Sequence, residues 1–396
     1  MTMPTNGLFL TEEQLLFKKV LREYCEENIA PYYRETHPYN APGDGYDDYY
    51  HKWMKELGDM DCWRLGINPA FGGLSGDIID RMIICEELCR VNGGIAVHAM
   101  VQPTHGEQVA MYAPEAWKSG LGEKILSGEY SVAGAFNSPE GQVNFSEQAP
   151  LAKKVEGGWL LNGNKCFSSV GPVCDVLLVL GLTEDGTTYG FVVNNETPGL
   201  TMTVHNEIGN SPTYATYKLE DVFVPDTHAG DAMIATNRKM NPFPPAAKGF
   251  GLLVAAGAIG SMDAAFEKTV EYWKKRTCDG KPLASMGECQ RKLAIMKTEI
   301  EAARALTWTA ARKIQAADAD AIVVADAAKA YTCETARRIT DECVQMWGCL
   351  GIDPDTGIIQ HHLDCMGLSI GVCTPDERYS SIATNMGLPG ATFQCL

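Results

Sequence analysis

The sequence predicts an α+β multidomain fold: an N-terminal helical domain (1–131), a central antiparallel β-barrel (132–242) and a C-terminal four-helix bundle (243–396). Two observations predict this order. From Ala133 to Pro225, apolar residues come in short runs separated by turn residues, which is typical of strands. On either side of this stretch, apolar residues recur with the spacing of amphipathic helices.

Short runs of β-branched, aromatic and other apolar residues define the central strands. Gly and Asn tolerate a positive φ, so the turns between the runs favour tight connections and a compact antiparallel barrel or sandwich. The runs are Val155, Trp159–Leu161, Val176–Leu180, Tyr189–Val193, Leu200–Val204 and Tyr217–Val224, and the turns lie at Gly157–Gly158, Asn162–Gly163, Asp185–Gly186, Pro198–Gly199 and Gly209.

The N-terminal part opens with a helix-start signal. Thr11 and Gln14 have the spacing of a capping box. The helix that follows places its apolar residues on one face and is expected to stop before Pro31; these residues are Leu15, Leu16, Val20, Leu21 and Tyr24. Further helices are expected over 49–57, with Gly58 at its end, and over 77–91, 96–111 and 114–126.

The C-terminal part begins after the Pro-rich segment 242–246. Small residues dominate between Gly249 and Gly260, which allows helices to approach one another closely. Helical patterns over 264–275, 292–316, 319–347 and 380–386 complete a predicted bundle.

Composition narrows the class of function. The 396 residues carry a formal net charge of -17, which argues against a nucleic-acid partner. We expect a soluble cytoplasmic protein, because no signal-peptide pattern and no uninterrupted apolar run of membrane length is present. None of the 14 cysteines forms a CxxC pair, so buried thiols in a reducing compartment are expected rather than a metal site.

Five motifs follow one another along the chain: Leu57-Gly58 through Gly73, Ile125–Glu129, Asn162–Ser169, Leu219–Pro225 and Gln345–Gly351. In this order they resemble "LG…P…GG", "LxxGE", "NGxKxWIT", "FEDVxVP" and "QxxGGxG" of the acyl-CoA dehydrogenase family. Several motifs in the right order are a much stronger signal than any one of them alone. The likeness covers nearly the whole chain.

The resemblance implies a cofactor and partners. FAD would lie noncovalently at the junction of barrel and bundle, with an acyl-CoA or enoyl-CoA between the helical domains. The family assembles as a tetramer in which the adenosine end of FAD reaches a neighbouring subunit, and it passes electrons to an electron-transferring flavoprotein. A homotetramer is expected, with a mixed tetramer of paralogous chains as an alternative.

The resemblance also implies the residues that contact the flavin. Asn137 would hydrogen-bond the pyrimidine side of the ring, Phe167 would stack on its edge, and Ser169 would bond N5. Arg276 would pair with the pyrophosphate. The full implied set is Phe136, Asn137, Ser138, Val143, Phe167, Ser168, Ser169, Arg276, Gln345, Gly348, Cys349, Thr374 and Asp376, and Val143, Gly371 and Val372 would contact the substrate. Several of these depart from the family pattern, so loss of the cofactor is an alternative.

The residue that removes the α-proton is the main departure. The family uses the Glu of "IYEGTSEIQ" as the base. Counting from Gln345 without a gap puts Val372 at this position, and Val cannot accept a proton. A shifted register would bring Asp376 or Glu377 there as the catalytic carboxylate. The alternative interpretation places both in the first turn of a helix that begins near Pro375, where the helix dipole favours them.

Three functions follow from this resemblance. The first is a flavoprotein that moves a hydride between the β-carbon of a CoA thioester and flavin N5, as a dehydrogenase or an enoyl-CoA reductase. The sequence resembles the branch of the family that includes crotonobetainyl-CoA reductase, which also lacks this Glu. Proton transfer would then fall to Glu377, Asp376, His98, His105 or water. The others are a non-catalytic subunit of a mixed tetramer and a desulfinase-like lyase.

Overall fold

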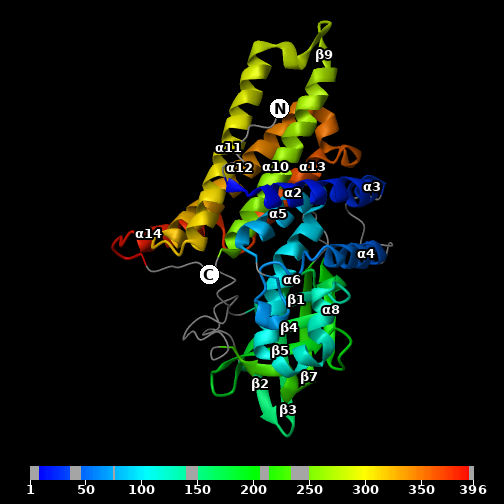
Figure 1. The fold of residues 1–396 in the computed structure, drawn as a ribbon, viewed down its shortest axis with the longest axis vertical. Helices are drawn as coiled ribbons and strands as arrows, with labels where there is room; N and C mark the ends of the chain where they lie inside the picture. The colour runs from blue at the N-terminus through cyan, green and yellow to red at the C-terminus, as the bar shows by residue number, and fades with distance from the viewer. Residues whose placement is uncertain are drawn as a thin grey trace.

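The computed structural model describes residues 9–35, 46–74, 76–139, 150–205, 214–232 and 249–391. A β-sheet lies at one end of the elongated molecule and the long C-terminal helices reach the other end (Figure 1). The N-terminal helices lie between them, so the predicted order of helical part, sheet and helical part is confirmed.

The N-terminal part is helical, as predicted. Its helices are α2 (Glu12–Tyr24), α3 (Ala30–Glu35), α4 (Tyr46–Asp59), α5 (Ile78–Cys89), α6 (Gly93–Tyr112), α7 (Pro114–Ala116) and α8 (Gly122–Leu126), with π-helical segments at Cys25–Ile29 and Trp117–Leu121. Thr11 and Gln14 form the predicted capping box at the start of α2. Asp77 and Asp80 form a second box at the start of α5.

Two helix ends differ from the prediction. The helix does not stop before Pro31, which is the second residue of α3. The π-helical segment just before Pro31 already interrupts the regular α-helical hydrogen bonds. The missing N–H of proline therefore costs little free energy at this point. Gly58 does not end α4 but lies inside it. A Cβ at Gly58 would lie 2.1 Å from the carbonyl oxygen of Ser127, so glycine allows close packing.

Much of the predicted apolar face of α2 points away from the core; Leu21 is buried and Tyr24 half-buried against the core. Leu15, Leu16 and Val20 are exposed, whereas Lys18 is buried. Charge explains this orientation, because Lys18 Nζ lies 3.0 Å from Glu86 and 2.6 Å from Glu87 of α5. Burying those carboxylates without a cation would cost more free energy than exposing three aliphatic side chains.

The central sheet is mixed, and the predicted barrel is not confirmed. Its strands are β1 (Val132–Ala135), β2 (Pro150–Val155), β3 (Gly158–Ser169), β4 (Val176–Thr183), β5 (Thr188–Asn194), β6 (Leu200–His205), β7 (Tyr214–Pro225) and β8 (Ala229–Asp231). They follow the order β6-β7-β3-β2-β4-β5-β8, with β1 beside β4. The predicted antiparallel pairing is wrong for β1–β4 and β2–β4, which are parallel.

The C-terminal part is a bundle around the buried helix α10. Its helices are α10 (Phe250–Lys275), α11 (Gly287–Gln315), α12 (Ala321–Trp347), α13 (Ile358–Ile370) and α14 (Pro375–Asn385), and a short hairpin of β9 (Thr277–Cys278) and β10 (Lys281–Pro282) joins α10 to α11. α10 packs against α11, α12 and α13 and also against α5, which joins the bundle to the N-terminal part. α13 was not predicted.

A buried network of charges crosses the contact between α5 and the bundle. Arg304 of α11 binds Glu86 of α5 and, through Nη2, Asp263 of α10 at 2.8 Å. Lys18 extends the network to α2. All four side chains are less than one-tenth exposed, so the network replaces apolar contacts at this point of the core.

Two composition-based predictions can be checked here. α10 is long and apolar enough to cross a membrane, but 89% of its most apolar window is buried, as in the core helix of a soluble protein.

All 13 cysteines in the described ranges are free thiols, nine of them buried, and no group of metal-ligating side chains occurs in those ranges. Burial raises the pKa of the Cys62 and Cys85 thiols to about 12.

Candidate active site

The two predicted flavin stretches meet at the edge of the sheet. Asn137, just after β1, pairs with Cys166 of β3, and the Cys166 N–H donates to the Asn137 carbonyl at 3.0 Å. Lys165, which is buried, donates to the Phe136 carbonyl at 3.2 Å. Ser168 Oγ donates to the Gly134 carbonyl at 2.9 Å. These bonds hold the segment after β1 against β3.

A β-bulge directs Phe167 out of the sheet. The pairing of β3 with β7 shifts register between Lys165 and Ser168, and Phe167 has a φ of 54°. A bulge re-aims the side chain it carries. Phe167 is 61% exposed, with one ring contact to Tyr214 at 5.6 Å between centroids. An exposed aromatic ring of this kind offers a flat apolar face to a ligand.

Ser138 provides a second sign of a binding site. It is buried, and its Oγ has no hydrogen-bond partner among the described residues. Buried hydroxyls are nearly always paired, so an unpaired one calls for a ligand or a water. Together with Phe167 and the exposed Ser169, this atom fits a planar cofactor with polar edges. Val143 lies outside the described residues.

Two histidines of α6 lie behind this edge. The ring of His105 meets Phe136 edge-on at 5.0 Å, and its Nδ1 bonds Gln108 at 2.9 Å. His98 Nε2 bonds Gln102 at 3.0 Å. Burial lowers the pKa of His98 to about 3 and that of His105 to about 4. Both imidazoles are therefore neutral at pH 7 and carry no acidic proton.

The predicted pyrophosphate and adenosine residues form a second cluster. Arg276 Nη1 donates to the Tyr272 hydroxyl at 2.8 Å, and Tyr272 stacks on Trp347 at 4.2 Å. This stack brings exposed Arg276 close to the chain segment of Gln345, Gly348 and Cys349. The cluster lies at the end of α10 that is remote from the sheet (Figure 1). One chain therefore presents the two halves of the predicted flavin site at opposite ends.

The region of the expected base is the turn between α13 and α14. Val372 and Gly371 are half-buried, and Val372 packs against the core. Thr374 caps α14, and Oε2 of Glu377 accepts the Thr374 N–H at 2.6 Å and its hydroxyl at 2.9 Å. The interpretation of Asp376 and Glu377 as first-turn carboxylates is confirmed, and a catalytic role for either stays a prediction.

Two further residues at this turn escaped the sequence analysis. Lys329 of α12 and Arg378 of α14 are buried and donate to backbone carbonyls of the turn. The available signal for Lys329 was a pair of charged residues, Asp326 and Lys329, in an alanine-rich stretch of a predicted helix. No local pattern distinguishes Arg378 from a surface residue of α14.

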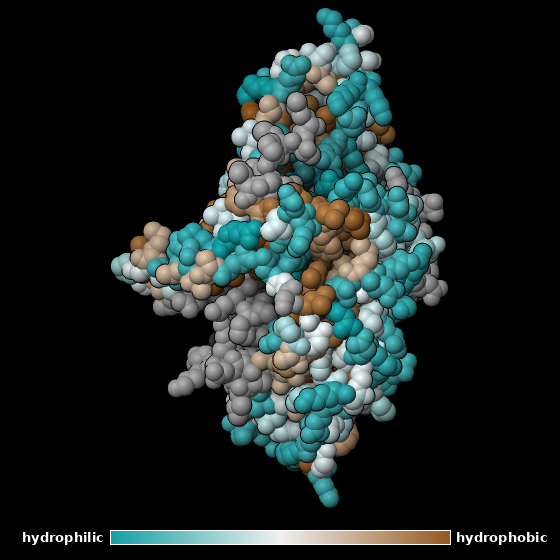
Figure 2. Space-filling model, in the orientation of Figure 1, coloured by the Kyte–Doolittle hydropathy of each residue, from teal (hydrophilic) through white to brown (hydrophobic). Residues whose placement is uncertain are grey.

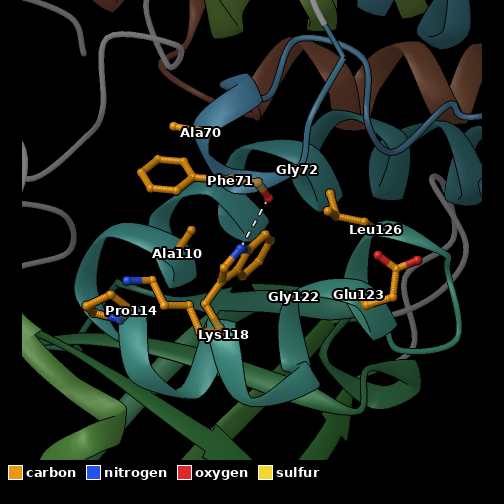
Figure 3. A pocket seen from close by; sticks show the side chains of 10 residues that line it. Ala70, Phe71, Gly72, Ala110, Pro114, Lys118, Gly122, Glu123 and Leu126 are labelled. Atoms are coloured by element: carbon orange, nitrogen blue, oxygen red, sulfur yellow. Dashed lines mark hydrogen bonds between the residues drawn. The ribbon is translucent and has the colours of Figure 1, made fainter.

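The described residues also form a surface pocket of about 410 Å³ (Figure 3). It lies between the segment Ala70–Gly72 and the segment Pro114–Leu126, and Trp117 Nε1 donates to the Phe71 carbonyl at 3.2 Å beside it. None of the predicted flavin or substrate residues lines this pocket. We therefore do not assign the chemistry to it.

The exposed ring of Phe167 and the buried Ser138 hydroxyl, which has no partner among the described residues, are features expected of a site for a cofactor. Residues 11–129 match the model of the acyl-CoA dehydrogenase N-terminal domain, and residues 251–386 match that of the C-terminal domain. The chain is 30% identical to the short-chain specific acyl-CoA dehydrogenase of Megasphaera elsdenii, over 90% of this chain and 93% of that protein. The chain belongs to the acyl-CoA dehydrogenase family.

Two more comparisons bear on the chemistry. The chain is 25% identical to a 3-(aryl)acrylate reductase of Clostridium sporogenes, over 96% of this chain and all of that protein. A Mycobacterium smegmatis glutaryl-CoA dehydrogenase in complex with FADH2 shares the fold, with a TM-score of 0.82, 19% identity and coverage of 98% of each chain. The predicted class, an oxidoreductase of acyl-CoA thioesters with FAD as cofactor, is confirmed at the level of the family.

Proposed function

We propose that this protein is an FAD-dependent enoyl-CoA reductase, which saturates the α,β double bond of a CoA thioester. What carries the proposal is Val372, which the ungapped count from Gln345 places at the position of the family's base. FAD, when bound, supplies two-electron hydride chemistry. Asn137, Phe167 and Ser169 would hold its ring at the sheet edge, with Ser138 Oγ as a further donor.

The direction follows from what each reaction demands of the protein. Dehydrogenation requires a positioned base, because the α-proton of a thioester is weakly acidic. In the described residues, Glu377 is bonded to the cap of α14, and His98 and His105 are buried behind the sheet edge. Reduction leaves a strongly basic α-carbon, which water can protonate. The family relative that acts as a 3-(aryl)acrylate reductase supports the same direction.

A complete flavin site would need a second copy of the chain. α10 has 26 residues, so Arg276 lies about 39 Å along the helix from its start. One FAD cannot extend from the sheet edge to this cluster within a single chain. We infer that Arg276, Gln345, Gly348 and Cys349 serve the flavin of a neighbouring subunit in a homotetramer. Gly371, Val372 and Val143 would contact the substrate, and the compartment would be the cytoplasm.

The proposal is tested by the colour of the protein. Purified protein should be yellow, its dithionite-reduced form should be rapidly reoxidised by an enoyl-CoA, and a saturated acyl-CoA should bleach it far more slowly. Rapid bleaching by the acyl-CoA would contradict the assigned direction. A protein that binds flavin only with a paralogous chain would be a subunit of a mixed tetramer. A flavin that stays oxidised throughout turnover would indicate elimination.

We infer that the exposed apolar face of α2 contacts another protein, and the electron-transferring flavoprotein expected for the family is the proposed partner. Leu15, Leu16 and Val20 are 36%, 62% and 45% exposed, and Figure 2 shows hydrophobic side chains gathered at mid-height, over and below α2. Large aliphatic side chains turned to solvent on one helix face are typical of a protein contact. Leu16→Glu should therefore lower the rate of reduction by that flavoprotein about tenfold and leave the dithionite-driven rate unchanged.

Met202→Glu is the matched control, because Met202 is 38% exposed on β6 of the sheet. It places the same new charge on an exposed apolar position away from α2. Equal effects of the two substitutions on the flavoprotein-coupled rate would contradict docking at α2.

A further inference from the structure

The turn between α13 and α14 has an unfavourable backbone. Val372 has a φ of 54° and Cys373 a φ of 68°. A β-branched residue almost never adopts a positive φ, because its branched side chain collides with the backbone. Strain of this kind persists only where the surrounding structure imposes it, and it gathers at functional sites.

Two buried cations impose this conformation. Lys329 Nζ donates to the carbonyls of Ser369, at 2.8 Å, and Cys373, at 2.5 Å. Arg378 Nη2 donates to the carbonyl of Val372 at 2.6 Å. Lys329 is fully buried and Arg378 is 4% exposed. Three carbonyls in five residues are therefore held from inside the protein.

Arg378 is itself held firmly. Its Nη1 donates to Asp326 Oδ1 of α12 at 2.6 Å, and Ser381 Oγ donates to Oδ2 of the same carboxylate at 2.6 Å. Its buried Nε has no partner among the described residues, so at least this donor of the guanidinium is left over. A Cβ at Gly251, in the first turn of α10, would lie 3.1 Å from Nη2.

Arg378 thus lies against both the turn at Val372 and the first turn of α10. We propose that Arg378 and Lys329 are positioning residues, which hold the turn at Val372 and place positive charge beside the α-carbon of the substrate. This inference rests on the proposed function. The turn would act through positive charge, whereas the family's carboxylate acts by removing a proton.

The reaction explains why positive charge helps. In enoyl-CoA reduction the reduced flavin would supply a hydride to the β-carbon, and the electron pair of the double bond would move to the α-carbon and the thioester oxygen. Water then supplies the proton that the α-carbon takes up. The acyl group carries an extra negative charge only between the arrival of the hydride and the uptake of the proton. The positive charge of Lys329, together with that of Arg378 in so far as Asp326 does not balance it, would lower the energy of that state more than the energy of the neutral enoyl-CoA, which raises kcat rather than lowering KM.

The test uses the full chain with FAD and crotonyl-CoA as probe substrate. Arg378→Gln should lower kcat for enoyl-CoA reduction about 100-fold with little change in KM. It should also speed hydrogen exchange at the amides of 370–374 about tenfold, because the turn loses its clamp. Arg378→Lys keeps the positive charge but loses the planar guanidinium that bonds two groups at once. Its kcat should therefore be close to that of the parent, whereas its hydrogen exchange at the turn should remain fast. Arg338→Gln, which removes an exposed arginine from α12, should change neither.

Ser381→Ala covers the case in which Arg378→Gln does not fold, because it removes one anchor of Asp326 and leaves both cations in place. Hydrogen exchange at the amides of 370–374 should become faster and kcat should fall, and both changes should be smaller than in Arg378→Gln. Unchanged exchange at the turn, or a kcat within threefold of the parent in either variant, would overturn the inference. Failure of the parent to be reoxidised by any enoyl-CoA would instead remove the proposed function, and exchange at the turn would still report on the clamp.

Discussion

Val372→Glu should raise the rate at which a saturated acyl-CoA bleaches the flavin by about 100-fold. The substitution places a carboxylate where the family carries its base, and a general base contributes about 10²–10⁴ to such a rate. Glu is not β-branched, so it also fits the positive φ at this position better than Val does. Stopped-flow absorbance under anaerobic conditions measures the bleaching directly.

Val372→Gln is the matched control for this substitution. It has the size and polarity of Glu but cannot accept the α-proton at neutral pH, so its bleaching rate should equal that of the parent. The rate of the Glu variant should rise with pH as its carboxyl ionises and should then level off. Equal rates in the Glu and Gln variants would show that position 372 does not face the α-carbon, and the ungapped register would be wrong.

Arg304→Met should destabilise the protein by about 3–5 kcal/mol, the largest effect that we expect on the free energy of unfolding. Arg304 is 4% exposed and contacts Glu86 and Asp263, so its loss leaves two buried carboxylates with less compensation. Chemical denaturation at neutral pH measures the change. Arg338→Met should cost less than about 1 kcal/mol, because Arg338 pairs with Glu299 at the surface.

The same network predicts a dependence of stability on pH. Burial alone would raise the pKa of Glu86, but Arg304 and Lys18 outweigh it and lower the pKa to about 2. A carboxyl whose pKa is lower in the folded state stabilises the fold above its ordinary pKa of 4.5, and this contribution is lost as the pH falls to about 2. The parent should lose more stability than Arg304→Met between these two pH values. Parallel losses would contradict the assignment.

Several features of the fold could be predicted because they depend on neighbours in sequence. The six predicted strand runs all lie in strands of the sheet, since turn residues such as Gly157 and Gly199 adopt the positive φ that turns require. The predicted capping box at Thr11 forms because its two members are only three residues apart. The candidate flavin stretches around Asn137 and Phe167 were found by motif, and the sheet brings them together.

Other features could not be predicted, because they depend on residues far apart in the chain. The parallel pairing of β1 with β4 joins segments about forty residues apart, and no periodicity indicates it. The clamp on Val372 joins Lys329 and Arg378 from separate helices. Buried cations look like surface residues in a sequence, because most Lys and Arg side chains are exposed.

By itself the sequence predicted the six strand runs of the central sheet and most of the helices, showed which family the chain resembles and, by an ungapped count, placed Val372 where the family has a carboxylate. Turn preference, helical period and motif order are local properties, so they can be read without coordinates. Only the tertiary structure decided that α2 turns Lys18 inward and Leu15, Leu16 and Val20 outward, and that buried cations hold the turn at Val372. Leaving a buried charge unpaired costs more free energy than exposing a few apolar side chains, and which residue becomes the partner depends on the fold.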